Sequence, residues 1–296
     1  MNKILLVHSL ARAFKNEVNM KIFCGILVKD EADIIKSCIL DMKRWADKIF
    51  VMDNGSTDGT WEIVQSLADD IVIPWKQEAK TYCSGIRSEI FNNFKDEVSE
   101  GDWWCYKCDA DEFYLDNPKE FLAKVPRKYS VVAKKSLDFV LTPEDAEDCE
   151  FTGDFEKDKV HVNKIKNAPC WSEPRFFRYR KSLKWVSKDG LDGDRLFGEI
   201  CPDLILVKHY QCRSPKQMQH RLDIRNALST KKAGIAFNHV KEKDWRELLC
   251  KKEECIVIEN DEEARKVADS LPFHCGWRKP LWKRLIIRAG IALRLW

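Results

Sequence analysis

The stretch Val51-Met52-Asp53-Asn54-Gly55-Ser56-Thr57-Asp58-Gly59-Thr60 decides the fold class of this chain. It begins inside a short apolar run, which predicts a β-strand, and it ends where helical spacing begins. Gly55 and Gly59 permit tight turns between the two elements. We therefore expect a strand–turn–helix unit with Asp53 at the last position of the strand, although an ordinary βα turn has a similar composition.

The chain repeats this alternation on both sides of the stretch. A continuous apolar run at 21–28 predicts a strand buried on both faces, and helical spacing follows at 32–45. Further helices are expected at 61–68 and 83–94, and further strands at 71–73 and 103–108. This order predicts βαβ units and a parallel sheet, whose ligands bind beyond the carboxyl ends of the strands.

The second half of the chain has a different pattern. Residues 129–133, 136–141, 176–179 and 204–207 are predicted strands, 143–168 a long polar loop, 215–228 a helix, and 241–270 a largely helical, charged segment. We expect an α/β fold with a mostly parallel sheet flanked by helices. The predicted segments are a peripheral 1–19, a domain at 20–240 and a helical C-terminal extension at 241–296.

Composition narrows the class of protein. Of 296 residues, 44% are hydrophobic and 11% aromatic, which is enough for a proper core. The net charge of +3, from 51 basic and 48 acidic residues, argues against a nucleic-acid partner. The N-terminal apolar run at 4–7 is too short for a signal peptide. We expect a cytoplasmic protein.

Twelve cysteines are therefore expected to be reduced and mostly buried. Cys105 and Cys108 form a C-x-x-C within a predicted strand. An odd separation on a regular strand places two side chains on opposite faces. No second C-x-x-C completes a four-ligand site, so we do not expect structural zinc.

Asp109-Ala110-Asp111-Glu112 directly follows the predicted strand at 103–108. Neighbouring carboxylates repel each other unless a cation or a proton compensates, and oxygen ligands suit Mg²⁺ or Mn²⁺. Taken alone, such a cluster is weak evidence and usually indicates only a solvated acidic turn. Its importance comes from its place, because Glu31 and Asp53 also follow strands and are expected at the same edge of the sheet.

Over roughly residues 20–125 the chain resembles the family 2 glycosyltransferases, which have the GT-A fold. The likeness rests on 26–31, 51–60, Arg87 and 109–113, in the same order and spacing. Residues 208–214 resemble a late segment of one bacterial branch. The resemblance implies transfer of a sugar from a nucleotide-diphosphate sugar, usually a UDP-sugar, with inversion and with Mn²⁺ or Mg²⁺ as cofactor.

The resemblance also implies roles for matched positions. The nucleotide-sugar donor would be bound by Val28, Glu31, Asp53, Arg87, Asp109 and Arg213. Asp111 would bind the metal, with Asp109 and His209 as further candidates. Structural roles for a single histidine are also common, so both readings of His209 stay open.

An inverting transfer needs a general base for the acceptor hydroxyl. Candidates are Asp189, Asp192, Asp194 and Glu199, and Asp192 is favoured because glycines flank it closely. The related branch often has a His-Glu pair here, which this sequence lacks, and a solvated acidic loop is the alternative. Residues 171–175 and Trp185 are expected to form an aromatic platform for the acceptor.

The segment 277–296 is basic and contains no acidic residue. Helical spacing places its apolar side chains mainly on one face, which is typical of an interfacial helix on an anionic membrane surface, although a docked terminal helix has the same pattern. We expect a peripheral protein on the inner face of the plasma membrane with a glycan or lipid-linked acceptor. Alternatives are a sugar nucleotidyltransferase and a non-catalytic, membrane-associated nucleotide-sugar binding protein.

Overall fold

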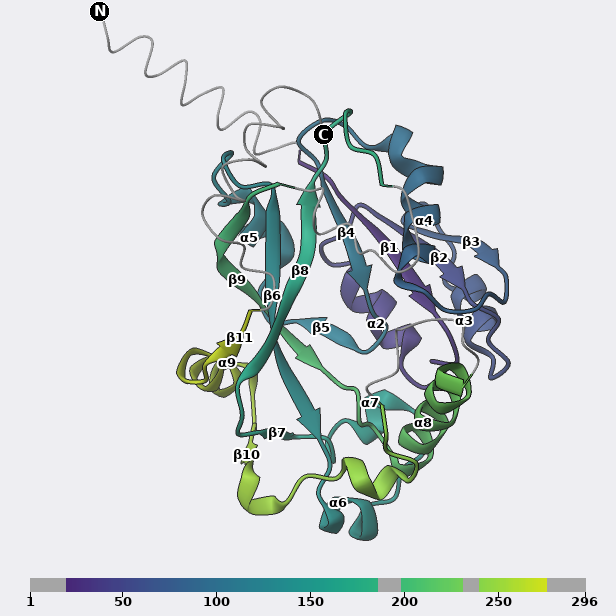
Figure 1. Ribbon diagram of the computed structural model, residues 1–296, viewed down its shortest axis with the longest axis vertical. Helices are drawn as coiled ribbons and strands as arrows, with labels where there is room; N and C mark the ends of the chain where they lie inside the picture. The colour runs from purple at the N-terminus through teal and green to yellow at the C-terminus, as the bar shows by residue number, and fades with distance from the viewer. Residues whose placement is uncertain (1–19, 186–197, 231–239, 276–296) are drawn as a thin grey trace, which may run out of the picture.

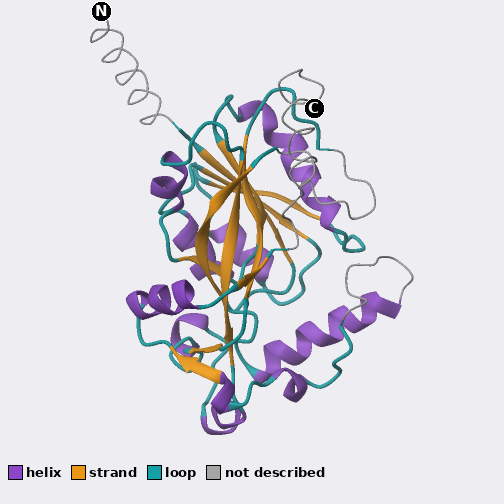
Figure 2. Cartoon of the chain, turned by 60° about the vertical axis from the view of Figure 1, so that its left-hand side comes forward, coloured by secondary structure: helices purple, strands orange, loops and turns teal. Residues whose placement is uncertain are grey.

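A twisted sheet with helices on both sides forms the centre of the protein (Figure 1, Figure 2). The structure, a computed structural model, describes residues 20–185, 198–230 and 240–275. Within these ranges the strands follow the order β10-β7-β6-β8-β4-β1-β2-β3, with β5, β9 and β11 joined beside this path. The described helices include none that is long and apolar enough to cross a membrane.

The parallel half of the sheet confirms the predicted α/β fold class. β1 (Ile22–Val28) lies between β2 (Lys48–Asp53) and β4 (Trp103–Cys108), and β3 (Val72–Gln77) pairs with β2. All three pairings are parallel. The connecting helices are α2 (Ile35–Met42), α3 (Thr60–Ser66) and α4 (Arg87–Phe94). Every residue of β1 is buried, as expected for a central strand between two layers of helices.

The other half of the sheet is mixed. β8 (Cys170–Arg178) runs antiparallel to β4 and to β6 (Val131–Val140). β9 (Ile200–His209) runs parallel to β6, and the short β5 (Glu112–Tyr114) pairs with β9. The β5–β9 register sets Glu112 opposite His209. This pairing brings the acidic cluster and the late histidine to the same place.

β6 is one strand where two were predicted. Lys134 and Lys135 interrupt the apolar pattern, but both are buried within the strand. Lys134 forms an ion pair with Glu112, and Lys135 donates to the carbonyl of Leu271 at 2.6 Å. Because these partners come from distant parts of the chain, the apolar pattern of the strand alone did not reveal that the lysines are buried.

The predicted loop at 143–168 contains short regular elements instead. These are α6 (Pro143–Asp148), α7 (Phe155–Asp158) and β7 (Lys164–Lys166). Thr142 caps α6 by accepting from the backbone of Asp145, and Asp154 caps α7. Helices this short are stabilised by their caps and have no apolar period, so the sequence pattern missed them.

Segment 241–275 contains more than helix. It includes two 3₁₀ turns and α9 (Asp261–Ser270), but also β10 (Cys255–Val257) and β11 (Phe273–His274). β10 pairs with β7 and β11 with β8, so this segment extends the sheet. The domain boundary at 240 stays a prediction. Segments 1–19 and 277–296 lie outside the described residues.

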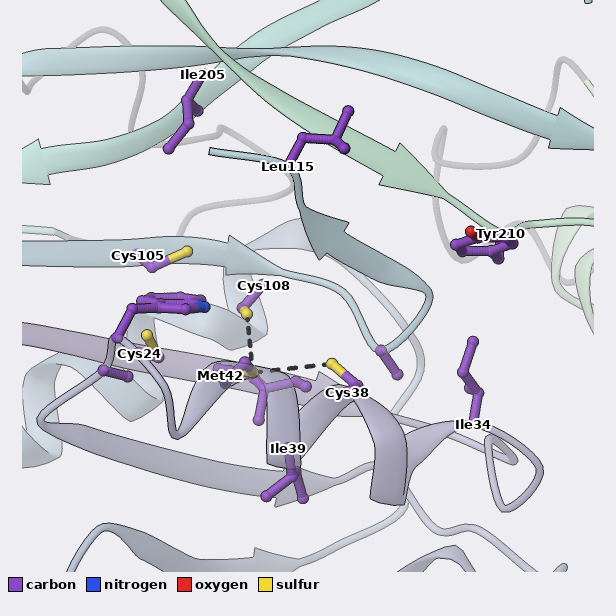
Figure 3. Close-up of a cluster of buried hydrophobic side chains, with 14 of the residues drawn as sticks. Cys24, Ile34, Cys38, Ile39, Met42, Cys105, Cys108, Leu115, Ile205 and Tyr210 are labelled. Carbon is purple, nitrogen blue, oxygen red and sulfur yellow. Dashed lines mark hydrogen bonds between the residues drawn. The ribbon is translucent and has the colours of Figure 1, made fainter. Parts of the chain in front are cut away.

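Sulfur-containing side chains pack together beneath β4 (Figure 3). Cys108 Sγ lies 3.6 Å from Met42 Sδ. The expectation that Cys105 and Cys108 face opposite ways is wrong, because both belong to the same core cluster. The β1–β4 register shifts between them, so three residues of β4 oppose two of β1. This bulge interrupts the alternation of side chains between the two faces of the strand, and Cys108 points to the same face as Cys105. All twelve cysteines are free and eight are buried, as predicted.

Candidate active site

Asp53 ends β2 and holds the turn that follows it. Its Oδ1 accepts hydrogen bonds from the backbone of Gly55 at 2.8 Å and of Ser56 at 2.7 Å. Its Oδ2 is buried without a hydrogen-bond partner. A buried carboxylate oxygen is costly to leave unpaired, so Asp53 Oδ2 is a candidate acceptor for a ligand.

The end of β1 is tied to the same turn. Asp30 Oδ1 accepts from the backbone of Thr57 at 2.8 Å, and the Asp30 backbone donates to Ser56 Oγ at 2.8 Å. Asp30 has a φ of 52°, a left-handed backbone conformation that is uncommon for residues other than glycine. These contacts hold the carboxyl ends of β1 and β2 in a fixed relation.

Asp109 is held between two arginines. Its Oδ1 lies 2.5 Å from Arg87 Nη2, and its Oδ2 lies 3.3 Å from Arg175 Nη2. Burial tends to raise the pKa of Asp109, but the two guanidinium groups hold this pKa below its usual value. Asp109 is thus ionised and its charge is already compensated by the protein.

Asp111 has a different set of partners. Its Oδ2 lies 3.4 Å from His209 Nε2 and 3.4 Å from Arg221 Nη1, on α8 (Pro215–Thr230). Against the effect of burial, His209 and then the arginines hold the pKa of Asp111 well below its usual value. His209 Nδ1 lies 2.8 Å from Asp138 Oδ1. Although burial lowers the pKa of His209, the two aspartates raise it to about 9.

Arg213 contacts carboxylates that follow two different strands at the carboxyl edge of the sheet. It lies 2.5 Å from Glu31 Oε2 and 2.7 Å from Asp33 Oδ2, and its Nη1 is 4.0 Å from Asp111 Oδ2. Burial, opposed by Arg213, raises the pKa of Glu31 to about 7. The structure therefore brings together the predicted donor and metal residues Glu31, Asp53, Arg87, Asp109, Asp111, His209 and Arg213 around the carboxyl edge of the sheet.

Other predicted residues are placed elsewhere. The side chain of Val28 is buried in the core, and its carbonyl accepts from Asn54 at 2.8 Å. Glu199 precedes β9, whereas His209 ends it, which separates them by roughly 30 Å at the usual rise of a strand. That distance makes Glu199 wrong as the general base. Asp189, Asp192 and Asp194 lie outside the described residues.

The prediction of an aromatic platform for the acceptor is wrong for Trp185. Trp185 is buried against Phe91 and Tyr106, so it belongs to the core. Trp171 is exposed on β8. A sequence pattern cannot separate these two cases, because both tryptophans lie in mixed polar and apolar surroundings.

Several charged residues of the site were not predicted in their roles, and Arg175 was expected only as part of the acceptor platform. Arg175 is fully buried, 2.5 Å from Glu112 and 2.9 Å from Glu173. The remaining missed residues are Lys134, Asp138 and Arg221. One signal was available, since charged side chains at 134, 138, 173 and 175 interrupt strand patterns that are otherwise apolar.

The described residues contain no group of three His, Cys, Asp or Glu side chains arranged to hold a metal. Asp111 and His209 form a pair of possible ligands instead. Mg²⁺ and Mn²⁺ sites commonly use one or two protein ligands and take the others from substrate phosphates and water. The pair is compatible with such a site, and Asp138 is placed to orient the imidazole.

Part of the chain is similar to known glycosyltransferases. Residues 24–134 match the model of Glycosyl transferase family 2. The SPbeta prophage-derived glycosyltransferase SunS of Bacillus subtilis (strain 168) is 30% identical over 140 residues, and so is Glycosyltransferase SunS of Bacillus phage SPbeta. The alignment covers 47% of this chain and only 31% of either relative.

Two solved structures are more distant. Mannosyl-3-phosphoglycerate synthase from Rubrobacter xylanophilus is 22% identical with a TM-score of 0.27, over 46% of this chain and 45% of its own. 4-Diphosphocytidyl-2C-methyl-D-erythritol synthase is 12% identical with a TM-score of 0.30, and the match covers 84% of this chain and 97% of that one.

Proposed function

Since residues 24–134 form a glycosyltransferase family 2 domain, we propose that this protein transfers a sugar from a nucleoside-diphosphate sugar, with UDP as the nucleotide. The observation that carries the proposal is the convergence of Asp53, Asp109 and Asp111 with three cationic side chains at one edge of a parallel sheet. Acidic groups there suit the base, ribose and metal, and cationic groups suit the diphosphate.

In this proposal Asp53 binds the base of the nucleotide. Its buried Oδ2 has no partner among the described residues, whereas uracil presents a ring N–H that needs an acceptor. The two backbone hydrogen bonds to Oδ1 hold the carboxylate in place, so little side-chain freedom is lost on binding.

Asp111 and His209 would hold the Mn²⁺ or Mg²⁺ ion. The ion would offset negative charge on the departing diphosphate. Asp138 orients His209 through its Nδ1, and Arg213 is placed beside the same edge to contact the phosphates. Asp109 has both oxygens engaged by arginines, so we assign it to the ribose or a metal-bound water and not to direct coordination.

The general base is proposed to be Asp192, which would take the proton of the acceptor hydroxyl in an inverting displacement. With Glu199 excluded by its distance, Asp189 and Asp194 are the other candidates of the same segment. Separate Asn substitutions test this assignment. Loss of transfer with retained donor binding in only one variant would identify the base.

The acceptor is proposed to be a glycan or a lipid-linked glycan at the inner face of the plasma membrane. The support is the basic, amphipathic pattern of 277–296. Deletion of this segment should move the protein from the membrane fraction to the soluble fraction, and unchanged fractionation would contradict the proposal.

Incubation with a panel of nucleotide sugars and Mn²⁺ tests the activity. We expect release of nucleoside diphosphate by the wild type and a loss of at least about a hundredfold in Asp111→Asn, as for other removals of electrostatic stabilisation. Asp203→Asn, at an exposed position of β9, is the matched control. Equal slow release by wild type and Asp111→Asn would contradict the proposal. Pyrophosphate release from a nucleoside triphosphate and a sugar phosphate would instead indicate a nucleotidyltransferase.

A further inference from the structure

Helix α8 places Arg221 within ion-pair distance of Asp111, the proposed metal ligand. Arg221 Nη1 lies 3.4 Å from Asp111 Oδ2 and donates to the carbonyl of Gln211 at 2.8 Å. His209 and Arg213 approach the same oxygen of Asp111, at 3.4 and 4.0 Å. The cationic neighbours of Asp111 thus gather at one of its two carboxylate oxygens.

A divalent cation and a guanidinium group compete for such an oxygen. The Asp111 side chain is 7% exposed, so its charge needs compensation at all times, and Arg221 and Arg213 contribute to it here. A metal ion at the same oxygen would be repelled by a guanidinium that stayed within 4 Å. One of the arginines must therefore move away when the ion binds.

The two arginines differ in their freedom to move. Arg213 is 3% exposed and is held by Glu31, Asp33 and the carbonyl of Tyr210. Arg221 is 22% exposed, and beside Asp111 it donates one hydrogen bond, to the carbonyl of Gln211. Arg221 is thus the side chain that can leave at small cost, and a donor diphosphate at this edge would offer it a new anionic partner.

We propose that Arg221 takes the place of the divalent cation at Asp111 in the donor-free protein, and that it turns to the donor diphosphate when donor and metal bind. The inference rests on the proposed function, because it needs a metal at Asp111. It makes binding of metal and nucleotide cooperative, because the diphosphate draws Arg221 away from Asp111, and the metal ion at Asp111 frees Arg221 to bind the diphosphate. Linkage then requires the same coupling factor in both directions.

Mn²⁺ binding, measured by the EPR signal of free Mn²⁺ without any turnover, tests the inference. For Arg221→Gln we expect binding of Mn²⁺ alone at least about fivefold tighter than in the wild type, and a smaller gain on adding UDP. Arg246→Gln, on an exposed arginine paired with Asp244, should bind as the wild type does. Arg225→Gln removes a positive charge that also interacts with Asp111. A smaller gain in Mn²⁺ affinity for this variant than for Arg221→Gln would show that the position of Arg221 matters, and not only the loss of one charge.

The inference is overturned if Arg221→Gln binds Mn²⁺ no more tightly than the wild type while Asp111→Asn abolishes binding. Wild-type Mn²⁺ binding by Asp111→Asn would instead contradict the metal site of the proposed function, and with it the inference. Thermal unfolding of each variant checks that the fold is retained. A fivefold or larger gain for Arg221→Gln that disappears in the double variant with Asp111→Asn supports the inference.

Discussion

Asp109 Oδ1 lies 2.5 Å from Arg87 Nη2, so the first carboxylate of the acidic cluster is compensated by the protein itself. Asp111, two residues later, meets an imidazole and a more exposed arginine at one oxygen, since His209 and Arg221 both lie 3.4 Å from its Oδ2. Two carboxylates that look equivalent in the sequence therefore have different chemical environments.

Asp109→Asn should bind Mn²⁺ within a few-fold of the wild type, whereas Asp111→Asn should lose binding. The reason is that both oxygens of Asp109 are engaged by Arg87 and Arg175, while Asp111 is paired with His209. Isothermal titration in the presence of UDP measures both variants. Equal losses in the two variants would show that Asp109 also coordinates the ion.

Arg175→Met should lower the free energy of unfolding by about 3–5 kcal/mol, as for other buried pairs that lose one partner. The guanidinium is fully buried and lies near the carboxylates of Asp109, Glu112 and Glu173, which would be left under-compensated. Urea denaturation measures the change. Arg127→Met, at an exposed position, should change stability by less than about 0.5 kcal/mol. A loss of under about 1 kcal/mol for Arg175→Met would contradict the importance of this network.

Gly55→Ala should weaken both stability and nucleotide binding. Gly55 has a φ of 79°, and an added Cβ would lie 2.6 Å from the Cβ of Ala79. The turn must shift, and Asp53 shifts with it because its Oδ1 accepts from the Gly55 backbone. Gly101→Ala is the matched control, since its φ is 100° but nothing lies within 4 Å. Only the strain of about 1 kcal/mol is expected there. Equal effects in both variants, by thermal unfolding and UDP binding, would exclude the steric contribution.

Asp69→Asn should lower stability at neutral pH and have a much smaller effect near pH 2. Lys43 and the backbone of Val72 and Ile71 lower the pKa of Asp69 to about 2. Because this pKa lies below the usual value of about 3.9, the carboxylate stabilises the fold above about pH 4 and loses this contribution as the pH falls through 2. The effect should stay below about 1 kcal/mol, since the pair is partly exposed. Thermal midpoints at pH 7, 4 and 2 measure it, and a difference as large at pH 2 as at pH 7 would contradict the assignment.

The sequence by itself determined the parallel half of the sheet and the turn after Asp53. Continuous apolar runs, helical spacing and the glycines of 51–60 are local properties, and local properties determine where a strand ends and which side chain stands there. The positions of Glu31, Asp53, Asp109 and Asp111 at one edge followed from the βαβ order, because parallel strands end together.

Only the tertiary structure decided which cationic side chain pairs with each carboxylate. Arg175 reaches Asp109 because β8 pairs with β4, and His209 reaches Asp111 because β9 pairs with β5. The extra residue in β4 likewise turned Cys108 to the same side as Cys105. Ion pairs and bulges depend on strand order and register between distant segments, and neither is encoded in the period of a single segment.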